Sequence, residues 1–293
     1  MMISKALQQW EADGRYFDWQ SHSIFYRDQG AGETLLCIHG FPTSSFDWRA
    51  MWPSLKKHYR VISLDLLGFG YSSKPRRNNY SVLQQADIIS ALLSSLMIDR
   101  AHICAHDLGD SIAQELLARQ ENHPGQNRFD IQSICFLNGG LFPETHRPRL
   151  IQTLLRGPLG PLLVHGLNEK KFSKSFAEVF GANTQPGAGD LSDFWHLIAL
   201  NNGHRLAHRL LQYIPERKKH RDRWLKAKQS TRVPMRLING PDDPVSGRHM
   251  LERYRELIPD ADAVELESIG HYPQIEAPGA VLAALLDFHK KIR

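Results

Sequence analysis

Residues 101–111, Ala-His-Ile-Cys-Ala-His-Asp-Leu-Gly-Asp-Ser, decide how this 293-residue chain folds. The stretch begins with an apolar run typical of a buried strand, and residues 111–119 have the character of a helix. Between the two, Asp107 is flanked at two positions on either side by Ala105 and Gly109. A sharp strand-to-helix turn needs small residues at these positions, because larger side chains would collide with neighbouring backbone. Such a turn exposes its central side chain for reaction, so the pattern predicts that Asp107 is a nucleophile.

Strand and helix patterns alternate on both sides of this stretch. Apolar strands are expected at 35–38, 61–64, 101–105, 131–137, 235–239 and 263–266, preceded by a hairpin of 16–19 with 23–28. Apolar residues at helical spacing are present at 81–96, 247–257 and 278–291. Nearly continuous apolar strands that alternate with helices indicate a mostly parallel sheet covered by helices on both faces.

The alternation is interrupted once, by a segment with helix and loop patterns and no convincing strand. This segment runs from residue 141 to residue 232. Because α/β folds bind their ligands at the carboxyl ends of the strands, a helical insertion at this point is expected to cover that edge of the sheet. The sequence therefore predicts an α/β core of residues 15–140 and 233–293 and a helical cap of residues 141–232. The cap contains enough apolar side chains to line an apolar pocket.

Motifs after three other predicted strands complete a catalytic arrangement. His271 follows the last strand and is expected to be the general base, and Asp243, after the penultimate strand, is expected to orient it. The motif His39-Gly40-Phe41-Pro42 follows the first long strand, so the main-chain amides of Phe41 and Leu108 are predicted to form an oxyanion hole. Each residue alone has an ordinary explanation as a helix cap or turn former. Their order and positions together favour catalysis.

Several of these motifs resemble one branch of a known family. Residues 39–42, Asp65-Leu66-Leu67-Gly68-Phe69-Gly70-Tyr71-Ser72 and His106-Asp107 are similar to the epoxide hydrolase and haloalkane dehalogenase branch of the α/β-hydrolases. Residues 138–148 (Asn-Gly-Gly-Leu-Phe-Pro-Glu-Thr-His-Arg-Pro), 211–214 and 271–274 are similar to the mesoderm-specific transcript proteins. The resemblance extends from about residue 16 to the C terminus. It implies an α/β-hydrolase fold, with a mostly parallel eight-stranded sheet, helices on both faces and a helical cap, and a hydrolase that needs no cofactor.

A carboxylate nucleophile implies a particular reaction. It attacks carbonyl groups poorly, but it displaces a leaving group at a saturated carbon and so forms an alkyl-enzyme ester. His271, held by Asp243, is then expected to activate the water that attacks the carbonyl carbon of the Asp107 ester. The oxyanion that develops would be stabilised by the two amides of the oxyanion hole. The expected substrates are small apolar molecules with an epoxide or a halide, together with water.

The residues next to the nucleophile favour the epoxide. By resemblance, dehalogenases hold the halide with a tryptophan after the nucleophile and often an asparagine after His-Gly, whereas this chain has Leu108 and Phe41 there. Epoxide hydrolases generally use two cap tyrosines, and residues 141–232 contain only Tyr213. A second proton donor would have to be His146, His196 or His204. The alternatives are a haloalkane dehalogenase, an ester or lactone hydrolase in which Asp107 acts through water, and a non-catalytic ligand-binding member of the fold.

Two further assignments concern the surroundings of the triad. Trp195 and His39, together with Tyr213, are expected to contact the substrate. Asp242 and Glu144 are alternative positions for the orienting acid, and the Gly-x-x-Asp spacing favours Asp243 over both.

The net charge and the cysteines indicate which binding partners and which covalent or metal links are expected. The net charge is +5, and much of the excess lies in the run 217–223, which is expected to be a solvated helix face because no nucleic-acid recognition motif accompanies it. Cys37, Cys104 and Cys135 lie in apolar runs without paired spacing, so neither disulfides nor a metal site are expected. The sequence has no signal-peptide pattern and no apolar stretch of about 20 residues. A cytoplasmic protein without an integral membrane segment is expected, and the oligomeric state is left open.

Overall fold

A computed structural model describes residues 3–292, which form an eight-stranded sheet. The strands are β1 (Arg15–Trp19), β2 (His22–Gln29), β3 (Thr34–Ile38), β4 (Arg60–Leu64), β5 (Arg100–Ala105), β6 (Asp130–Phe136), β7 (Met235–Asn239) and β8 (Asp262–Glu265). Their order across the sheet is β1-β2-β4-β3-β5-β6-β7-β8. Strand β2 pairs antiparallel with β1 and β4, and the pairs from β4 to β8 are parallel. The predicted α/β-hydrolase sheet is confirmed.

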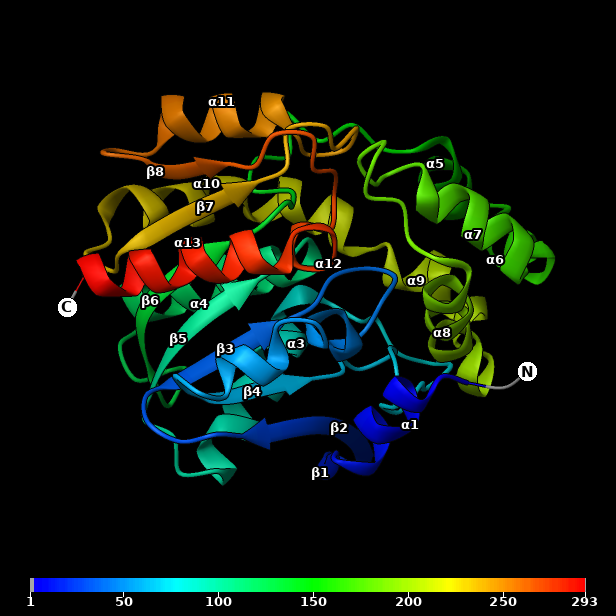
Figure 1. Cartoon of the computed structure of the whole chain (residues 1–293), viewed down its shortest axis with the longest axis horizontal. Helices are drawn as coiled ribbons and strands as arrows, with labels where there is room; N and C mark the ends of the chain where they lie inside the picture. Colours follow the sequence, from blue (N-terminus) through cyan, green and yellow to red (C-terminus); the bar gives the residue numbers. More distant parts are fainter. Residues whose placement is uncertain (1–2, 293) are drawn as a thin grey trace.

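Helices cover both faces of the sheet, as its apolar strands require. The core helices are α1 (Lys5–Ala12), η1 (Ser45–Trp48), α2 (Trp52–Leu55), α3 (Val82–Ser95), α4 (Leu108–Asn122), α11 (Arg248–Leu257), α12 (Pro273–Glu276) and α13 (Pro278–Lys291). In β3, Leu36 and Ile38 pack into the apolar cluster that includes α3 and α4, whereas Leu35 and Cys37 pack into the cluster that includes α1 and α13. Figure 1 shows α13 in front of the sheet and α4 behind it. A strand buried on both faces has no polar side to alternate with, which explains its continuous apolar sequence.

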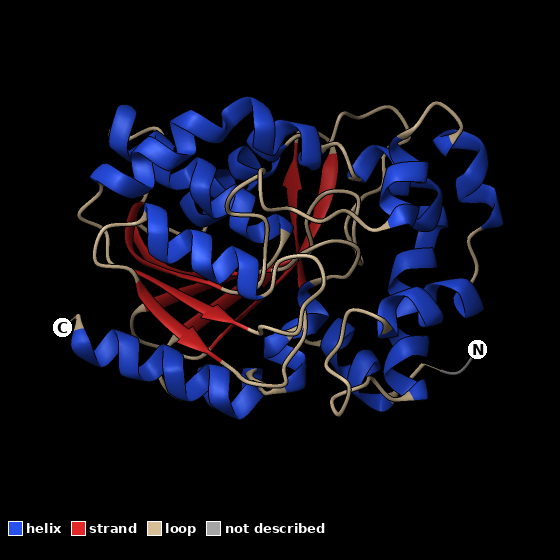
Figure 2. Cartoon of the chain, turned by 90° about the horizontal axis from the view of Figure 1, so that it is seen from above, coloured by secondary structure: helices blue, strands red, loops and turns tan. Residues whose placement is uncertain are grey.

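The segment between β6 and β7 is helical. Its elements are α5 (Leu150–Arg156), α6 (Gly160–Leu163), η2 (Val164–Gly166), α7 (Glu169–Ala177), α8 (Ala188–Ala199), η3 (Leu200–Leu206), α9 (Ala207–Leu210) and α10 (Tyr213–Ser230). The helices from α5 to α9 are grouped at one end of the molecule, toward which the arrows of β5 and β7 point (Figures 1 and 2). Helix α10 instead packs along α4. The range predicted for the cap, 141–232, therefore contains helices over the strand ends and one helix that lies against the core, and the division into domains stays a prediction.

Local sequence signals explain where several helices begin. The side chains of Ser4, Ser81 and Asn168 accept hydrogen bonds from backbone amides in the first turns of α1, α3 and α7. Such a cap satisfies an amide that the helix cannot, and is worth about 1 kcal/mol. Helix α1 places Leu7 and Trp10 in the core, so the amphipathic pattern at the N-terminal end of the sequence is used for packing.

Two other expectations concern cysteines and membranes. Cys37, Cys104 and Cys135 are free and buried, as predicted. The hydrogen bond with Cys135, together with burial, raises the pKa of the Cys104 thiol, so this side chain behaves as a small apolar group. Within residues 3–292, the helices are too short or too polar for any of them to cross a membrane.

Candidate active site

Asp107 occupies a strained turn between β5 and α4. Its backbone angles are φ 48° and ψ −103°, a region that residues other than glycine rarely adopt and that a surrounding structure must enforce. Here the Asp107 amide donates a hydrogen bond of 3.1 Å to the carbonyl of Asn138 at the end of β6. Gly109 is required because a Cβ atom there would lie 2.4 Å from the carbonyl oxygen of Ile38. The structure thus has the sharp strand-to-helix turn that the sequence pattern predicts.

The Asp107 carboxylate meets donors from the core and from α10. The backbone amide of Phe41 donates to Oδ2 at 3.1 Å, and the hydroxyl of Tyr213 donates to the same oxygen at 3.4 Å. Leu108, the other residue predicted for the oxyanion hole, is the first residue of α4 and follows Asp107 directly. Two of the predicted site residues, Phe41 and Tyr213, are therefore in direct contact with the predicted nucleophile.

His271 and Asp243 form a buried pair beside this carboxylate. The Nδ1 atom of His271 lies 2.7 Å from Oδ2 of Asp243. Asp243 also accepts hydrogen bonds from the amides of Val245 and Ser246 and from the Ser246 hydroxyl, at 2.7, 3.0 and 2.6 Å. Burial alone would raise the pKa of Asp243, but His271 and these donors lower it below its ordinary value. For His271, burial acts to lower the pKa, and the Asp243 charge outweighs it, so the pKa of His271 is raised.

Helix α10 provides a buried positive charge that contacts Asp107. Arg217, on α10, is only 1% exposed, and its Nη2 donates to Oδ1 of Asp107 at 3.1 Å and to the Asp107 carbonyl at 2.9 Å. Its Nε donates to the Ser111 hydroxyl at 2.7 Å, and its guanidinium carbon lies 4.5 Å from the centre of the Tyr213 ring. Burial acts to raise the pKa of Asp107, but the charges of Arg217 and His271 outweigh it, so the pKa is lowered. Asp107 is thus held ionised.

The prediction that residues 217–223 form a solvated helix face is wrong for Arg217. That residue is buried against Asp107, whereas its neighbours Lys218 and Lys219 are exposed. The buried side chains of α10 include Tyr213, Arg217, Trp224 and Lys228, which share one face at spacings of four, seven and four residues. This spacing is the sequence signal that identifies Arg217 as an inward-facing residue.

The motif Asn138-Gly139-Gly140 makes room for these charged groups. A Cβ atom at Gly140 would lie 2.2 Å from Nη1 of Arg217, and one at Gly139 would lie 2.1 Å from Oδ2 of Asp110. The Asn138 amide group donates to the carbonyl of Gly240 at 2.8 Å and to Oδ2 of Asp243 at 3.1 Å. A motif first noticed by resemblance thus has a physical role, because it connects Asp107, Arg217 and Asp243.

Further ionisable side chains lie between α4 and α10, close to Asp107. Asp110 is completely buried, and burial together with the Asp107 charge raises its pKa well above the ordinary value. Lys228 is hydrogen-bonded to Gln114 and to the carbonyl of Leu141, the latter at 3.2 Å, and burial lowers its pKa to about 7. The region between α4 and α10 is therefore polar, in contrast to the apolar clusters against the sheet.

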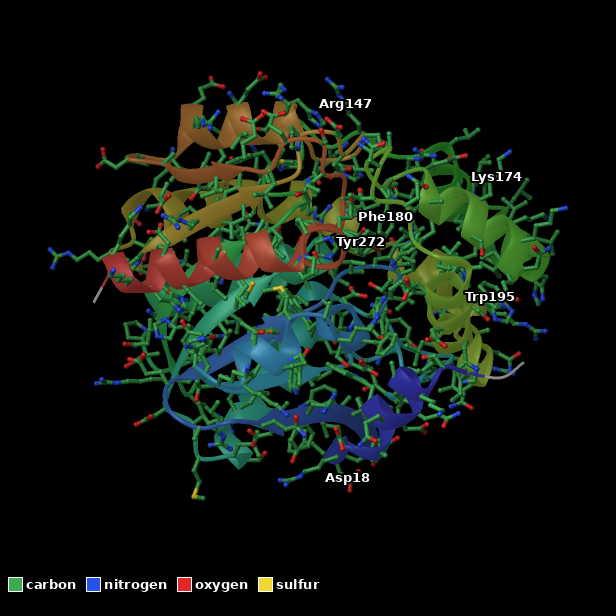
Figure 3. All side chains as sticks on the ribbon, in the orientation of Figure 1. Asp18, Arg147, Lys174, Phe180, Trp195 and Tyr272 are labelled. Carbon is green, nitrogen blue, oxygen red and sulfur yellow. The ribbon has the colours of Figure 1, made fainter. Side chains whose placement is uncertain are left out.

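The other side of Asp107 faces a cavity of about 380 Å³. Asp107 and His271 line it from the core, and most of the other lining residues are apolar, among them Ile151, Leu155, Phe172, Phe176, Trp195 and Ile198 on α5, α7 and α8. Trp195 lines this cavity, as predicted for a substrate-binding residue, and so does Phe41. At the boundary between cap and core, Phe180 stacks on Tyr272 with ring centres 5.1 Å apart (Figure 3). The cavity has the size and apolar lining of a small-molecule site.

His39 does not face this cavity, contrary to expectation. Its ring is completely buried, its Nδ1 donates to the carbonyl of Gly40 at 2.8 Å, and its Nε2 accepts from the amide of Leu66 at 3.0 Å. Both nitrogens are occupied by the backbone, so the ring supports the loop that carries Phe41. His106, next to the nucleophile, has a similar role, because its Nε2 contacts the carbonyl of His271 at 2.8 Å.

The alternative residues for the site lie in different places. Glu144 forms ion pairs with Arg221 and Arg253, and Asp242 is exposed, so Asp243 is the carboxylate that meets His271. His204 lines the cavity, 5.6 Å from the Trp195 ring.

His146 is another candidate for the second donor. Both of its ring nitrogens are buried and lack a hydrogen-bond partner within residues 3–292. Burial, together with the charge of Arg217, lowers its pKa to about 4, so the ring is neutral at neutral pH.

Comparison with known proteins agrees with this geometry. The sequence profile of the α/β-hydrolase family matches residues 35–285, and the chain belongs to that family. Within it, the chain is 44% identical to the mesoderm-specific transcript homolog protein of Bos taurus over 298 residues, which cover 98% of this chain and 88% of the relative. The family resemblance predicted from the motifs is confirmed.

Other relatives and solved structures align with most of this chain. The protein LipZ of Mycobacterium tuberculosis is 37% identical, covering 97% of this chain and 98% of LipZ. A cis-3-alkyl-4-alkyloxetan-2-one decarboxylase of Shewanella oneidensis is 28% identical, covering 91% and 85%. Epoxide hydrolase CorEH (TM-score 0.78, 20% identity, covering 96% and 99%) and haloalkane dehalogenase DbeA of Bradyrhizobium elkani (TM-score 0.80, 19% identity, covering 95% and 98%) have the same fold.

Proposed function

We propose that this α/β-hydrolase opens epoxide rings of small apolar molecules through an ester on Asp107. The observation that carries the proposal is the placement of one ionised carboxylate, Asp107, at the floor of an apolar cavity that also exposes His271. A carboxylate reacts with a saturated carbon rather than with a carbonyl, and a strained ring supplies such a carbon with a leaving oxygen attached.

In the first step, Asp107 attacks a ring carbon of the epoxide. A bond forms between a carboxylate oxygen and this carbon, and the bond from the carbon to the ring oxygen breaks with its electron pair on oxygen. Tyr213, whose hydroxyl is 3.4 Å from Asp107, donates its proton to that oxygen. The phenolate that remains lies under the guanidinium of Arg217, which stabilises its charge.

Arg217 makes Tyr213 a stronger acid during the first step, when the leaving epoxide oxygen needs a proton. Burial and the Asp107 carboxylate raise the pKa of Tyr213 in the free enzyme. Ester formation removes the negative charge of Asp107, while the positive charge of Arg217 stays in place. The pKa of Tyr213 therefore falls as the leaving oxygen gains charge, which helps the proton transfer.

In the second step, water hydrolyses the ester. His271, with Nδ1–H donating to Asp243, takes a proton from water at Nε2, and the water oxygen attacks the carbonyl carbon of Asp107. The oxyanion develops where the amide of Phe41 already donates a hydrogen bond, and the amide of Leu108 is proposed as the second donor. The tetrahedral intermediate then collapses, and the bond from the Asp107 carbonyl carbon to the alkyl oxygen breaks. The leaving oxygen takes the second water proton from the Asp107 carboxyl group, which releases the diol and restores the carboxylate, and the proton on His271 is passed to the Tyr213 phenolate.

The test is to interrupt the second step. His271→Gln removes the base, so the ester is expected to accumulate and to be detected by mass spectrometry as Asp107 carrying the mass of the intact epoxide. A single turnover of the wild type in labelled water should place the label in the Asp107 carboxyl group. An unmodified Asp107 peptide in the variant, from a substrate that the wild type consumes, is incompatible with the proposal.

A strained lactone is the second candidate substrate. One relative, 28% identical, is named for its action on an oxetan-2-one, a four-membered ring in which a saturated carbon carries a carboxylate leaving group. Arg217 would favour such an anionic leaving group as well. Accumulation of the His271→Gln adduct from an oxetan-2-one, with none from an epoxide, would replace the first candidate by the second.

A further inference from the structure

The outer surface of the cap exposes an unusual group of leucines. They are Leu150 (74% exposed), Leu154 (47%), Leu159 (64%), Leu162 (73%) and Leu163 (40%), called here the outer leucine face. Within residues 3–292 the other strongly exposed large apolar side chains are Tyr16 and Met97, far away in sequence. Single exposed apolar side chains are common on soluble proteins, but five within one short segment indicate a surface that binds something.

Helix α5, which carries two of these leucines, also forms part of the wall of the active-site cavity, and α6, which carries Leu162 and Leu163, follows it in sequence. On α5, Ile151 and Leu155 line the cavity, whereas Leu150 and Leu154 lie on the exposed side of the same helix. Figure 1 shows α5, α6 and α7 together at the end of the molecule opposite to the C terminus. A partner that covers the outer leucine face would therefore lie one helix away from the cavity.

Basic side chains lie on the same segment as the leucines. Residues 149–178 contain five Lys and Arg and two Asp and Glu; Arg149 and Lys171 line the cavity, and Arg149 is paired with Glu178. Arg156, Lys170 and Lys174 are exposed, and Lys174 points away from the molecule in Figure 3. The segment thus combines exposed leucines with exposed positive charges, which complements an anionic layer over an apolar one.

We propose that the outer leucine face docks this protein on an anionic phospholipid bilayer, with the cavity one helix away from the lipid. Leucines accompanied by Lys and Arg are the pattern of segments that lie in a membrane interface. Protein–protein interfaces are instead enriched in aromatic residues, and leucine is under-represented among their energetically important positions. Exposed Arg156, Lys170 and Lys174 complement anionic headgroups, whereas Lys is depleted at protein–protein interfaces, so charge favours lipid over a protein partner. Substrate would then reach Asp107 from the lipid layer.

The test is co-sedimentation with vesicles, which is a readout independent of the chemistry proposed for Asp107. The full-length protein is expected to bind vesicles of phosphatidylcholine and phosphatidylglycerol in equal parts, and to bind phosphatidylcholine vesicles much less. High salt should weaken the binding because it screens the exposed basic side chains. The triple variant Leu159→Ser, Leu162→Ser and Leu163→Ser should bind at least about ten-fold more weakly, since three apolar side chains no longer enter the interface.

Matched variants separate the surface from the fold. Met97→Ser removes an even more exposed apolar side chain elsewhere and should leave binding unchanged, and Lys170→Glu with Lys174→Glu should remove the preference for anionic vesicles. The leucine variant should retain the wild-type circular dichroism spectrum and melting temperature, because the three side chains are exposed. Equal vesicle binding by wild type and leucine variant overturns the proposal. So does a wild type that ignores vesicles but forms a dimer that the leucine variant does not form, because the occupant would then be a second copy.

Discussion

The two sides of Asp107 differ in kind. On the cavity side, the carboxylate faces a wall of mostly apolar side chains that also includes His271, paired with Asp243, and the basic residues Arg149 and Lys171. On the other side, between α4 and α10, lie the buried groups Arg217, Asp110 and Lys228. An ionised carboxylate in an apolar cavity would be unstable without compensation, and the opposite side provides it. The cavity can therefore stay apolar for its substrate while its nucleophile stays charged.

The largest effect is expected from Arg217→Met. This change removes the guanidinium and leaves the Asp107 carboxylate buried without its main counter-charge, which should lower the free energy of unfolding by about 3–5 kcal/mol. The measurement is urea denaturation at neutral pH. Arg221→Met, on the same helix, breaks the partly exposed pair with Glu144 and should cost no more than about 1 kcal/mol.

A double variant tests whether charge is the cause. Arg217→Met combined with Asp107→Asn removes both members of the pair and should be clearly more stable than Arg217→Met alone. If the two losses simply add, the role of Arg217 is packing and the comparison of the two sides fails.

Asp243→Asn breaks the charged pair on the cavity side. It should slow hydrolysis of the Asp107 ester by about 10²–10⁴-fold, the usual contribution of general base catalysis. His271 acts as a base only when neutral, so the rate rises with pH through its pKa, which Asp243 raises in the wild type. Without that charge, burial lowers the pKa, and the rising limb of the pH–rate profile should move to lower pH. Single-turnover kinetics across pH measure both the rate of ester hydrolysis and the pH at which it rises. If the rising part of the pH–rate profile does not move, the group that titrates there is not His271.

Gly140→Ala tests the space around the Arg217 guanidinium, next to Asp107. The new methyl group would meet the Arg217 guanidinium at 2.2 Å and must displace it, which should cost about 1–3 kcal/mol of stability. Gly189→Ala, in α8, is a matched control, because a Cβ there has no atom within 4 Å and alanine favours a helix by about 1 kcal/mol. Thermal melts of the two variants should therefore shift in opposite directions.

Trp195→Ala should have the smallest effect, on the apolar wall of the cavity. The indole lines the cavity and packs beside Phe172 and His204, so its removal is expected to raise KM about ten-fold, equal to about 1.4 kcal/mol, with little change in kcat. Steady-state kinetics on an apolar epoxide give both constants. A fall in kcat with KM unchanged would mean that Trp195 acts on the transition state instead.

Most of the sheet and its order of motifs could be predicted from the sequence. Strands buried on both faces leave continuous apolar runs, and the elbow at Asp107 requires small neighbours such as Gly109. These features depend on residues close in sequence, which is why pattern analysis finds them. The pairing of His271 with Asp243 could be predicted because the motif order places both at the carboxyl ends of neighbouring strands.

The positions of other site residues could not be predicted, because they depend on the direction in which a side chain points. His39 was expected at the substrate because it ends a strand, but its ring turns inward to the backbone. Arg217 lies in a run of charges that resembles a solvated face, and only the packing of α10 on α4 shows that it points to Asp107. Composition cannot distinguish a buried charge from an exposed one when the partner carboxylate is 110 residues away in sequence.

The position of α10 has a consequence for how this protein can diversify. The helices that surround the substrate end before residue 213, whereas Tyr213 and Arg217 belong to a helix fixed against α4. Exchanging segments between residues 149 and 212 among relatives is therefore expected to change the accepted substrate, while Tyr213, the proposed proton donor, and Arg217 stay where they are. A chimera that cuts after residue 212 should keep the proposed reaction, and one that cuts after residue 230 should replace it.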